Sequence, residues 1–307
     1  MLIGVDFGGT KIEAVALAPG GETLARKRIP TPRGEYEGSI AAVTALVQDF
    51  EATVGRDGSV GIGIPGTISS ETGLVKNANS TWLNGRPLGN DLERALGRPV
   101  RIENDANCLA VSEATDGAGA GAGVVWAVIL GTGVGSGIAI ARRALGGRNG
   151  IAGEWGHNPL PWPRPDELPG PPCYCGKSGC IETFLSGPGF AADFPRRTGR
   201  EARAEEIMAA ARAGDGEALR AFERYADRLA RGLAHVVNVL DPDVIVLGGG
   251  MSDIEELYGG LPDRVAAFVI SDTFTTPILK SRHGPASGVR GAAWLWNDAA
   301  PGGHQQV

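Results

Sequence analysis

Cysteine is scarce in this chain, with 4 residues among 307. So low a content excludes a small secreted scaffold stapled by disulfides. Basic residues are not in excess either, because 29 Lys and Arg stand against 35 Asp and Glu, giving a net charge of −6. This balance argues against a general nucleic-acid binder, which presents a basic surface to phosphate groups.

Several other signals are missing from the sequence. No uninterrupted apolar run is long enough to cross a membrane. No basic segment precedes the apolar residues of the M-L-I-G-V-D start, as it does in a signal peptide. We therefore expect a cytoplasmic protein with reduced thiols and no membrane partner. The pattern G-x-x-x-x-G-K-[ST] is also absent, which excludes a P-loop.

Glycine, in contrast, is abundant, with 48 residues, and hydrophobic residues make up 42% of the chain. A soluble protein of this length and composition can bury a large core, and we expect two lobes. The glycines gather at the ends of predicted strands, which indicates backbone that approaches ligands.

Three of the four cysteines lie close together in the sequence. They are Cys173, Cys175 and Cys180, and His157 precedes them. One imidazole and three thiolates complete a tetrahedral zinc site, and a closed set of four protein ligands indicates a structural metal. A disulfide between Cys173 and Cys180 is the alternative, which the low cysteine content disfavours.

Two carboxylates, Glu154 and Glu182, flank this cluster. Both halves of the stretch, G-E-W-G-H and C-Y-C-G-K-S-G-C-I-E, resemble the signature of the ROK family of sugar kinases and repressors. The resemblance implies that His157 binds zinc through one ring nitrogen and a sugar hydroxyl through the other. It also implies that Glu154 and Glu182 contact the sugar. Zinc ligation fixes which nitrogen remains for the sugar, so the arrangement is physically reasonable.

A glycine turn joins two strands predicted at 2–7 and 11–17. The turn, Gly8-Gly9-Thr10, exposes backbone N–H groups, and Thr10 and Lys11 add side-chain donors that suit a phosphate. Asp6 at the strand end is a candidate to hold Mg²⁺ through water. A plain hairpin is the alternative, since short motifs match by chance. The segment resembles the first phosphate loop of the actin, hexokinase and Hsp70 superfamily.

The same arrangement recurs later in the chain. A strand predicted at 124–130 leads into G-T-G-V-G-S-G, from Gly131 to Gly137, and a further strand is predicted at 138–141. Thr132 and Gly133 are the expected phosphate contacts. The duplication predicts two related lobes around a nucleotide.

Two further segments follow predicted buried strands. Gly248 and Gly249 come after the strand at 244–247, and backbone without side chains can pack against a flat adenosine ring. The polar stretch K-N-A-N-S-T-W-L-N-G offers Asn79 and Ser80 to sugar hydroxyls. An ordinary surface loop is the alternative for the second segment.

A strand predicted at 99–103 is followed by N-D-A-N. Asp105 then falls at the start of a helix expected over 106–114, either as its N-cap or as a catalytic base. The ROK resemblance includes this segment and implies that Asp105 deprotonates the sugar hydroxyl, with Asn104 among the candidate sugar contacts. Cys108, inside the helix, is assigned no role because a lone helical cysteine is usually a small buried apolar residue.

The predicted architecture is an α/β protein with the two-lobed ribonuclease-H-like ATPase fold of actin and hexokinase and a structural zinc loop. Residues 1–117 and a C-terminal helix at 289–297 are expected to form one lobe. Residues 118–288, with the zinc-binding insertion 157–180, are expected to form the other. Further helices are predicted over 39–53, 203–213 and 217–240, and the tail from Ala299 is expected to be disordered.

Seven prolines lie between Asn158 and Cys173. Such a segment is stiff and extended and is expected to form a wall or lid beside the sugar. The spacing between histidine and cysteine is longer than is common among ROK glucokinases, which argues against glucose as the acceptor.

Within the family the chain resembles bacterial fructokinases and manno(fructo)kinases, because K-N-A-N-S-T-W-L-N-G and G-E-W-G-H-N-P-L-P-W occur together. The resemblance implies ATP-dependent phosphorylation of the 6-hydroxyl of D-fructose, with mannose as a further acceptor. Phosphates would be held by Thr10, Lys11, Thr132 and Gly133, with Mg²⁺ bridging their oxygens.

Alternatives to a fructokinase remain open. A ROK glucokinase or an N-acetylhexosamine kinase is the nearest one. A sugar sensor or a repressor without its DNA-binding part is remote, since no groove-reading element precedes the first strand. Family members are often dimers, so a homodimer is expected, with sugar and ATP as small-molecule partners and no nucleic acid.

Overall fold

The computed structural model describes residues 1–297, so the disorder expected from Ala299 onward lies outside the described residues. The chain forms two compact units. Unit 1 holds Met1–Ser112, Arg148–Gly150 and the segment that begins at Ala286, and unit 2 holds Glu113–Gly147 and Ile151–Pro285. The domain limits that the sequence suggests, 1–117 and 118–288, stay a prediction.

Unit 1 is built on a five-stranded sheet in the order β3-β2-β1-β4-β7. β1, β2 and β3 are antiparallel neighbours, whereas β4 and β7 extend the sheet from β1 in parallel. The carboxyl ends of β1, β4 and β7 therefore meet at one edge, where ligands bind in open α/β sheets. The strands are β1 (Leu2–Phe7), β2 (Lys11–Leu17), β3 (Thr23–Pro30), β4 (Ser59–Ile64) and β7 (Val100–Asn104), and β5 (Thr67–Ile68) with β6 (Val75–Lys76) forms a separate pair.

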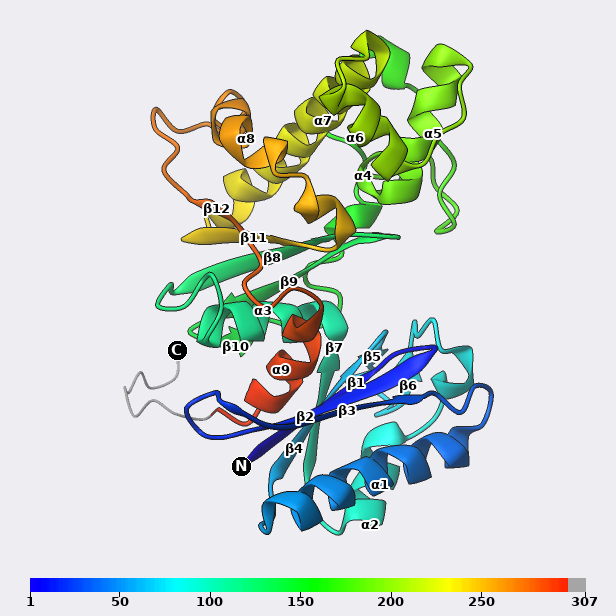
Figure 1. Ribbon diagram of the computed structural model, residues 1–307, viewed down its shortest axis with the longest axis vertical. Helices are drawn as coiled ribbons and strands as arrows, with labels where there is room; N and C mark the ends of the chain where they lie inside the picture. Colours follow the sequence, from blue (N-terminus) through cyan, green and yellow to red (C-terminus); the bar gives the residue numbers. More distant parts are fainter. Residues whose placement is uncertain (298–307) are drawn as a thin grey trace. The chain divides into compact units, whose positions relative to one another are not determined.

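Helices cover both faces of this sheet, with α1 and α2 on one face and α9 on the other (Figure 1). Two mid-strand glycines let α9 approach closely, because a Cβ at Gly4 or Gly61 would overlap a backbone carbonyl oxygen of that helix. These mid-strand glycines serve helix packing, unlike the glycines at strand ends, which the sequence predicts to approach ligands. The helices are α1 (Tyr36–Val54), η1 (Thr81–Leu83), α2 (Leu88–Leu96), α3 (Asp105–Thr115) and α9 (Ser287–Trp294).

Unit 2 repeats the sheet topology of unit 1, in the order β10-β9-β8-β11-β12. β8 and β9 form an antiparallel hairpin, and β11 and β12 continue from β8 in parallel. The duplication predicted from the two glycine turns is therefore confirmed in the fold. The strands are β8 (Val124–Leu130), β9 (Val134–Ile140), β10 (Arg143–Ala144), β11 (Val244–Gly248) and β12 (Ile278–Lys280).

One boundary in this sheet differs from the prediction. β9 begins at Val134 and not at 138, so the turn has three residues, Gly131 to Gly133, and not seven. Pairing with β8 runs from Leu130 opposite Val134 to Val124 opposite Ile140. These ladder hydrogen bonds hold the glycines after Gly133 in extended backbone, although their propensity for strands is low.

Helices of unit 2 gather over one face of its sheet (Figure 1). Their apolar side chains and those of the strands form a single core that includes Trp126, Tyr225 and Leu229. The Asp215 carboxylate caps the long helix α7 by accepting from the N–H groups of Glu217 and Ala218. The elements are η2 (Trp155–His157), η3 (Pro165–Glu167), α4 (Glu182–Leu185), α5 (Gly187–Thr198), α6 (Ala204–Arg212), α7 (Gly216–Leu240), η4 (Gly250–Asp253), α8 (Glu256–Ala266) and η5 (Gly284–Ala286).

The proline-rich segment is held against α7 by buried charges. Arg228 and Arg231 each donate to Oε1 of Glu167 at 2.8 Å. Arg231 also donates to the backbone carbonyl of Trp162 at 2.8 Å. The segment thus has a fixed path that includes the turn η3, and it is anchored to a core helix. Its predicted role as a wall beside the sugar stays a prediction.

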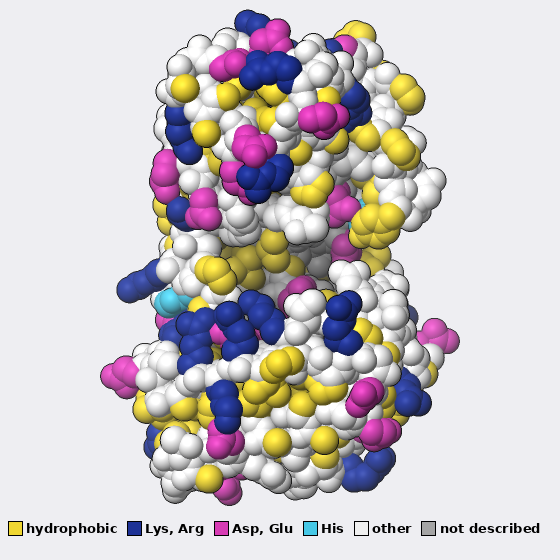
Figure 2. Space-filling view, turned by 45° about the vertical axis from the view of Figure 1, so that its right-hand side comes forward, with side chains coloured by type: hydrophobic (Ala, Val, Ile, Leu, Met, Phe, Trp, Pro, Cys, Tyr) yellow, Lys and Arg dark blue, Asp and Glu magenta, His cyan; other side chains and the backbone are white. Residues whose placement is uncertain are grey.

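The charged side chains on the molecular surface agree with the near balance of acidic and basic residues in the sequence. On the face that Figure 2 shows, Lys and Arg side chains of unit 2 are interspersed with Asp and Glu side chains, whereas several Lys and Arg side chains of unit 1 lie together. Over residues 1–297, no helix combines the length and the apolar character needed to span a bilayer.

Candidate active site and metal centre

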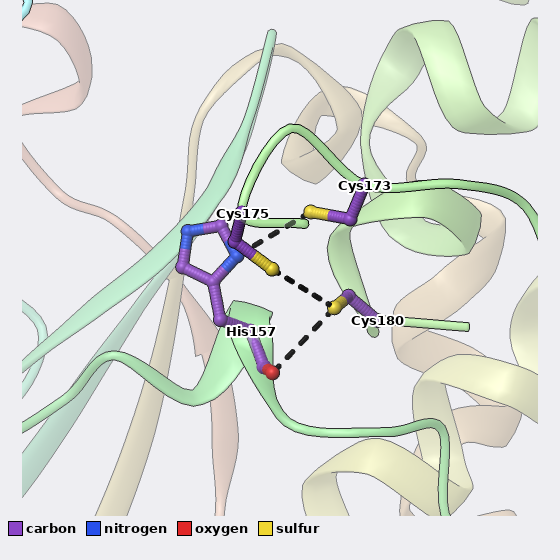
Figure 3. A group of neighbouring side chains, drawn as sticks. All are labelled: His157, Cys173, Cys175 and Cys180. Atoms are coloured by element: carbon purple, nitrogen blue, oxygen red, sulfur yellow. Dashed lines mark hydrogen bonds between the residues drawn. The ribbon is translucent and has the colours of Figure 1, made fainter. Parts of the chain in front are cut away.

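The fold brings His157, Cys173, Cys175 and Cys180 together, with their ligand atoms all within 4.8 Å of one another (Figure 3). Nδ1 of His157 lies 3.6 Å from Sγ of Cys173, and Sγ of Cys175 lies 3.6 Å from Sγ of Cys180. All four cysteines are free thiols, so the disulfide alternative is not supported. The grouping is the one that the spacing predicted.

Backbone hydrogen bonds shape the loop that carries the sulfurs. The N–H of Gly176 donates to the carbonyl of Cys173 at 3.0 Å, and the N–H of Cys173 donates to the carbonyl of Lys177 at 2.7 Å. This tight turn needs φ of 87° at Gly176, a left-handed conformation that glycine adopts without steric cost. The turn thereby directs Cys173 and Cys175 to the same centre.

The thiols strongly influence one another. Burial, together with the neighbouring thiols Cys175 and Cys173, raises the pKa of the Cys180 thiol to about 12. A hydrogen bond from the backbone N–H of Lys177 lowers the pKa of Cys175. A divalent cation supplies the positive charge that three adjacent thiolates require. The donor set fits tetrahedral zinc with no position left for water.

Next to this cluster lie the candidate sugar ligands of unit 2. Glu154 is exposed and directly precedes η2, which carries His157. Glu182 is the first residue of α4, and its Oε2 accepts a hydrogen bond from the N–H of Val134 at 2.9 Å. Since Val134 follows the second glycine turn, one carboxylate connects the cysteine loop with that turn.

A residue that sequence reasoning missed contacts the same histidine. Nε2 of His157 lies 2.9 Å from the hydroxyl of Tyr174, and the two rings meet edge to face. The side chain of Tyr174 is 83% exposed. Burial raises the pKa of its phenol, and the charges of Glu182 and Glu154 raise it too. The only sequence signal was its position between two candidate metal ligands in C-Y-C.

A cavity of about 620 Å³ in unit 2 is lined by both of its glycine turns. Gly131 and Thr132 come from the second predicted phosphate loop, and Gly250 and Met251 come from the turn after β11. Gly133 and the predicted pair Gly248 and Gly249 are not among the lining residues. The other lining residues, which no motif indicated, are Gly187, Pro188, Ala191, Arg203, Ala204, Glu205, Met208, Arg212, Asp253 and Ile254.

The turn after β11 has its own structural constraint. Gly249 has φ of 83°, and a Cβ there would lie 2.5 Å from the carbonyl oxygen of Leu130. Gly249 thus packs against the end of β8, and the next two residues face the cavity. Gly133 closes the second turn by accepting from the N–H of Gly131 at 2.9 Å.

In unit 1 the first glycine turn closes a β-hairpin. The N–H of Gly8 donates to the carbonyl of Lys11 at 3.0 Å, and Oγ1 of Thr31 donates to the carbonyl of Gly8 at 2.7 Å. Thr10 and Lys11 are exposed, and Gly9 lies beside Ser80. The hairpin alternative describes the backbone correctly, and the phosphate contacts of Gly8, Gly9, Thr10 and Lys11 stay a prediction.

Two carboxylates meet at the carboxyl edge of this sheet. Burial raises the pKa of Asp6 to about 6, the charge of Asp105 raises it as well, and that of Lys11 lowers it. Asp6 is the last residue but one of β1 and Asp105 follows β7, so the parallel strands bring the two side chains to one edge as the topology requires.

The capping role belongs to Asn104 rather than to Asp105. Oδ1 of Asn104 accepts from the N–H groups of Ala106 at 2.9 Å and Asn107 at 3.4 Å, and Nδ2 donates to the carbonyl of Gly66 at 3.1 Å. Helix α3 begins at Asp105 itself. The interpretation of Asp105 as the N-cap is therefore wrong. Both ends of the Asn104 amide are engaged within the protein, and its sugar contact stays a prediction.

The polar segment after β6 holds one exposed and one buried candidate. Asn79 is exposed, and its N–H donates to the carbonyl of Pro65 at 3.1 Å. Ser80 is fully buried, and its Oγ has no hydrogen-bond partner among residues 1–297. The segment therefore places polar groups beside the first glycine turn, and sugar binding by these groups stays a prediction.

Comparisons with known proteins agree on the family. The model of the ROK family matches residues 2–299. An N-acetyl-D-glucosamine kinase of Pectobacterium atrosepticum is 42% identical over 299 residues, covering 96% of this chain and 98% of that protein. A ROK hexokinase from Thermus thermophilus superimposes with a TM-score of 0.84 at 32% identity, covering 96% and 97%. A ROK family glucokinase from Streptomyces griseus, in complex with glucose and AMPPNP, gives a TM-score of 0.73 at 32% identity, covering 97% and 99%.

Proposed function

The chain belongs to the ROK family and is a sugar kinase, and we propose that it transfers the γ-phosphoryl group of ATP to the 6-hydroxyl of a hexose. The position of Glu182 is the main observation that supports this proposal. It lies two residues after the last cysteine of the cluster, and it is hydrogen-bonded to Val134 at the end of the second glycine turn. One side chain thus couples a candidate sugar site to a candidate phosphate site.

The nucleotide is assigned to the cavity of unit 2. Two glycine turns far apart in the sequence line it, as expected for backbone that packs against phosphates and a flat ring. The S. griseus glucokinase was crystallised with the ATP analogue AMPPNP. Thr132 is the residue of the second turn whose side chain can donate to a phosphate oxygen, and it lines the cavity. Gly133, Gly248 and Gly249 shape the turns around it.

In the proposed reaction Asp105 takes the proton from the sugar hydroxyl. Glu154, His157 and Glu182 orient the sugar, and Asn79 and Asn104 are further candidate contacts. Phosphoryl transfer needs little else than positioning and charge neutralisation. Mg²⁺, when bound near Asp6, supplies positive charge to the phosphate oxygens. Zinc, when bound by His157 and the three cysteines, fixes the loop that carries Glu182.

The acceptor is not set by the family alone, because the similar proteins are named after different sugars. N-Acetyl-D-glucosamine is the first candidate, since the P. atrosepticum kinase is 42% identical along nearly the whole chain. D-Fructose, the acceptor expected from K-N-A-N-S-T-W-L-N-G and G-E-W-G-H-N-P-L-P-W, is the second. The names of the compared proteins favour the N-acetylhexosamine alternative and do not support fructose.

A coupled assay of ADP release tests the proposal across N-acetyl-D-glucosamine, D-fructose, D-mannose and D-glucose. We expect one sugar to give a kcat/KM at least about tenfold above the others, a difference of about 1.4 kcal/mol in transition-state binding. Phosphorus NMR of the product identifies the phosphorylated hydroxyl. Absence of ADP release with every sugar, in the presence of Mg²⁺ and zinc, would contradict a kinase function.

A further inference from the structure

We propose that Tyr174 is a built-in competitor of the acceptor sugar, because its hydroxyl binds Nε2 of His157 and must leave before a sugar hydroxyl can bind that nitrogen. The inference rests on the proposed function, in which His157 is a sugar ligand. It adds a residue that controls access to the site and that no motif indicated.

The two nitrogens of His157 face different surroundings. Nδ1 lies 3.6 Å from Sγ of Cys173 and points into the cysteine cluster, as Figure 3 shows. Nε2 is therefore the nitrogen left for a ligand, and the hydroxyl of Tyr174 occupies it at 2.9 Å. A metal held at Nδ1 would leave the ring proton on Nε2, and the imidazole would then donate to the phenol oxygen. A sugar hydroxyl would accept the same proton.

Only the side chain of Tyr174 is free to move. Its backbone lies between Cys173 and Cys175, and hydrogen bonds of the tight turn fix it on both sides. The side chain, in contrast, is 83% exposed and meets the imidazole edge to face at 5.1 Å between ring centroids. Rotation of an exposed side chain takes picoseconds to nanoseconds, so the phenol can leave without any change in the metal loop.

The phenol of Tyr174 interacts with the same residues that we expect to bind the sugar. Besides His157, the carboxylates of Glu154 and Glu182 act electrostatically on Tyr174. Each of the three candidate sugar ligands of unit 2 thus interacts with this one side chain. A tyrosine hydroxyl both donates and accepts a hydrogen bond, as a sugar hydroxyl does. The phenol therefore resembles the ligand whose place it takes.

The variant Tyr174→Phe tests the inference, because it removes the competing hydroxyl and keeps the ring. The sugar is the one with the highest kcat/KM in the panel, and its Kd is measured by calorimetry without ATP. We expect the Kd and the KM of that sugar to fall about 2- to 10-fold, the value of one net hydrogen bond. We expect kcat, the KM of ATP and the zinc content to stay at wild-type values. Tyr174→Ala, which also removes the ring, should lower the Kd at least as far.

Tyr36→Phe is the matched control. The Tyr36 hydroxyl donates to Oδ2 of Asp91 at 2.7 Å in unit 1, and its loss should leave the sugar Kd unchanged. An unchanged Kd in Tyr174→Phe would overturn the inference, since the hydroxyl would not compete. A higher Kd would overturn it too, because the phenol would then contact the bound sugar. A wild-type protein that phosphorylates no sugar would refute the proposed function as well as this inference.

Discussion

At the start of α3, two neighbouring side chains have different structural roles. Asn104 caps the helix with its amide, whereas Asp105 is the first helical residue. Oδ1 of Asp105 also accepts from the N–H of Ala106 at 2.8 Å. An asparagine amide oxygen can accept the same bond, so Asp105→Asn keeps the helix start. The structure therefore permits a clean test of the proposed base.

Asp105→Asn should lower kcat about 10²-fold or more, the usual contribution of a general base. The Kd values of sugar and ATP should stay within about threefold of wild type, since the amide keeps the shape of the carboxylate. Coupled assays give kcat, and calorimetry gives the two Kd values. Asp91→Asn, a carboxylate of α2 that pairs with Arg94, is the control and should keep full activity. A variant of Asp105 that retains more than about a tenth of wild-type kcat would exclude it as the base.

Residue types and spacing predicted the cysteine cluster because metal ligation demands particular donor atoms close in sequence. They did not predict the contact of Tyr174 with His157. Which way an exposed side chain turns depends on neighbours brought in by the fold, and no spacing rule records that. The same limit applies to Asn104 and Asp105. The sequence placed the polar pair correctly and gave the N-cap as one alternative for Asp105, whereas Asn104 accepts the capping hydrogen bonds.

Among the elements, three of the four strands in the two hairpins were predicted with their exact bounds, whereas β9, β3 and α5 were not. β1, β2 and β8 have the predicted bounds, since their apolar runs are buried. β3 was missed because it lies at a sheet edge and carries Arg26, Lys27 and Arg28. α5 was missed because it has an internal proline, Pro195, which ordinarily ends a helix.

The second glycine turn leads to a prediction about nucleotide affinity. Thr132 lines the cavity of unit 2, and Thr132→Val keeps the shape of the side chain but removes its hydroxyl. If that hydroxyl donates to a phosphate oxygen, the KM of ATP should rise about 2- to 10-fold, while the KM of the sugar stays constant. Thr276→Val, whose hydroxyl donates to the carbonyl of Pro242, is the control. An unchanged KM of ATP would leave the turn with a structural role only.

The anchor of the proline-rich segment predicts a pH dependence of stability. Burial alone would raise the pKa of Glu167, but hydrogen bonds from Arg231, the Arg164 backbone and Arg228 lower it from 4.5 to about 2. The depressed pKa stabilises the fold above pH 4.5, and this contribution is lost as the pH falls toward 2. In that window the free energy of unfolding should fall by about 1.4 kcal/mol per pH unit from this group.

Glu167→Gln should remove this part of the pH dependence. Urea unfolding at several pH values between 5 and 3 would show a shallower slope than in wild type. At pH 7 the variant should also be less stable, by about 3 kcal/mol, because Arg228 and Arg231 lose their buried counter-charge. The exposed carboxylate of Glu22 provides the control, and Glu22→Gln should keep the wild-type slope. If the free energy of unfolding depended on pH equally in Glu167→Gln and in the wild type, the assigned ion pair would be contradicted.

Across the whole molecule, the repeated sheet is the feature that the sequence predicted best. The two glycine turns with threonine marked equivalent hairpins, and the order of strands is the same in both units. The return of α9 to β1 and β4 depends on Gly4 and Gly61, two mid-strand glycines to which the sequence analysis gave no role. Long-range packing of this kind leaves no local pattern, so it could be read only from the fold.

We expect the metal cluster to affect both the stability of the fold and the affinity for the sugar. Cys175→Ser removes one of four ligands whose atoms lie within 4.8 Å, and elemental analysis should show the loss of one zinc per chain. With no open coordination position, the metal activates nothing itself. Its loss should instead let His157 rotate and loosen the loop that carries Glu182. The KM of the sugar should then rise, kcat should fall with it, and urea should unfold the protein at a lower concentration.

Cys108→Ser is the control that distinguishes the loss of a cluster thiol from the loss of any other thiol. Cys108 is a fully buried cysteine outside the cluster, so this variant should keep the wild-type zinc content even where it lowers stability. The KM of ATP should stay near wild type in Cys175→Ser, because the glycine turns that line the cavity of unit 2 contain none of the four ligands. A Cys175→Ser protein that loses its zinc yet keeps its sugar KM would show that the cluster stabilises the fold without organising the sugar ligands. In that case Glu182 would be positioned by Val134 alone, through the hydrogen bond of 2.9 Å.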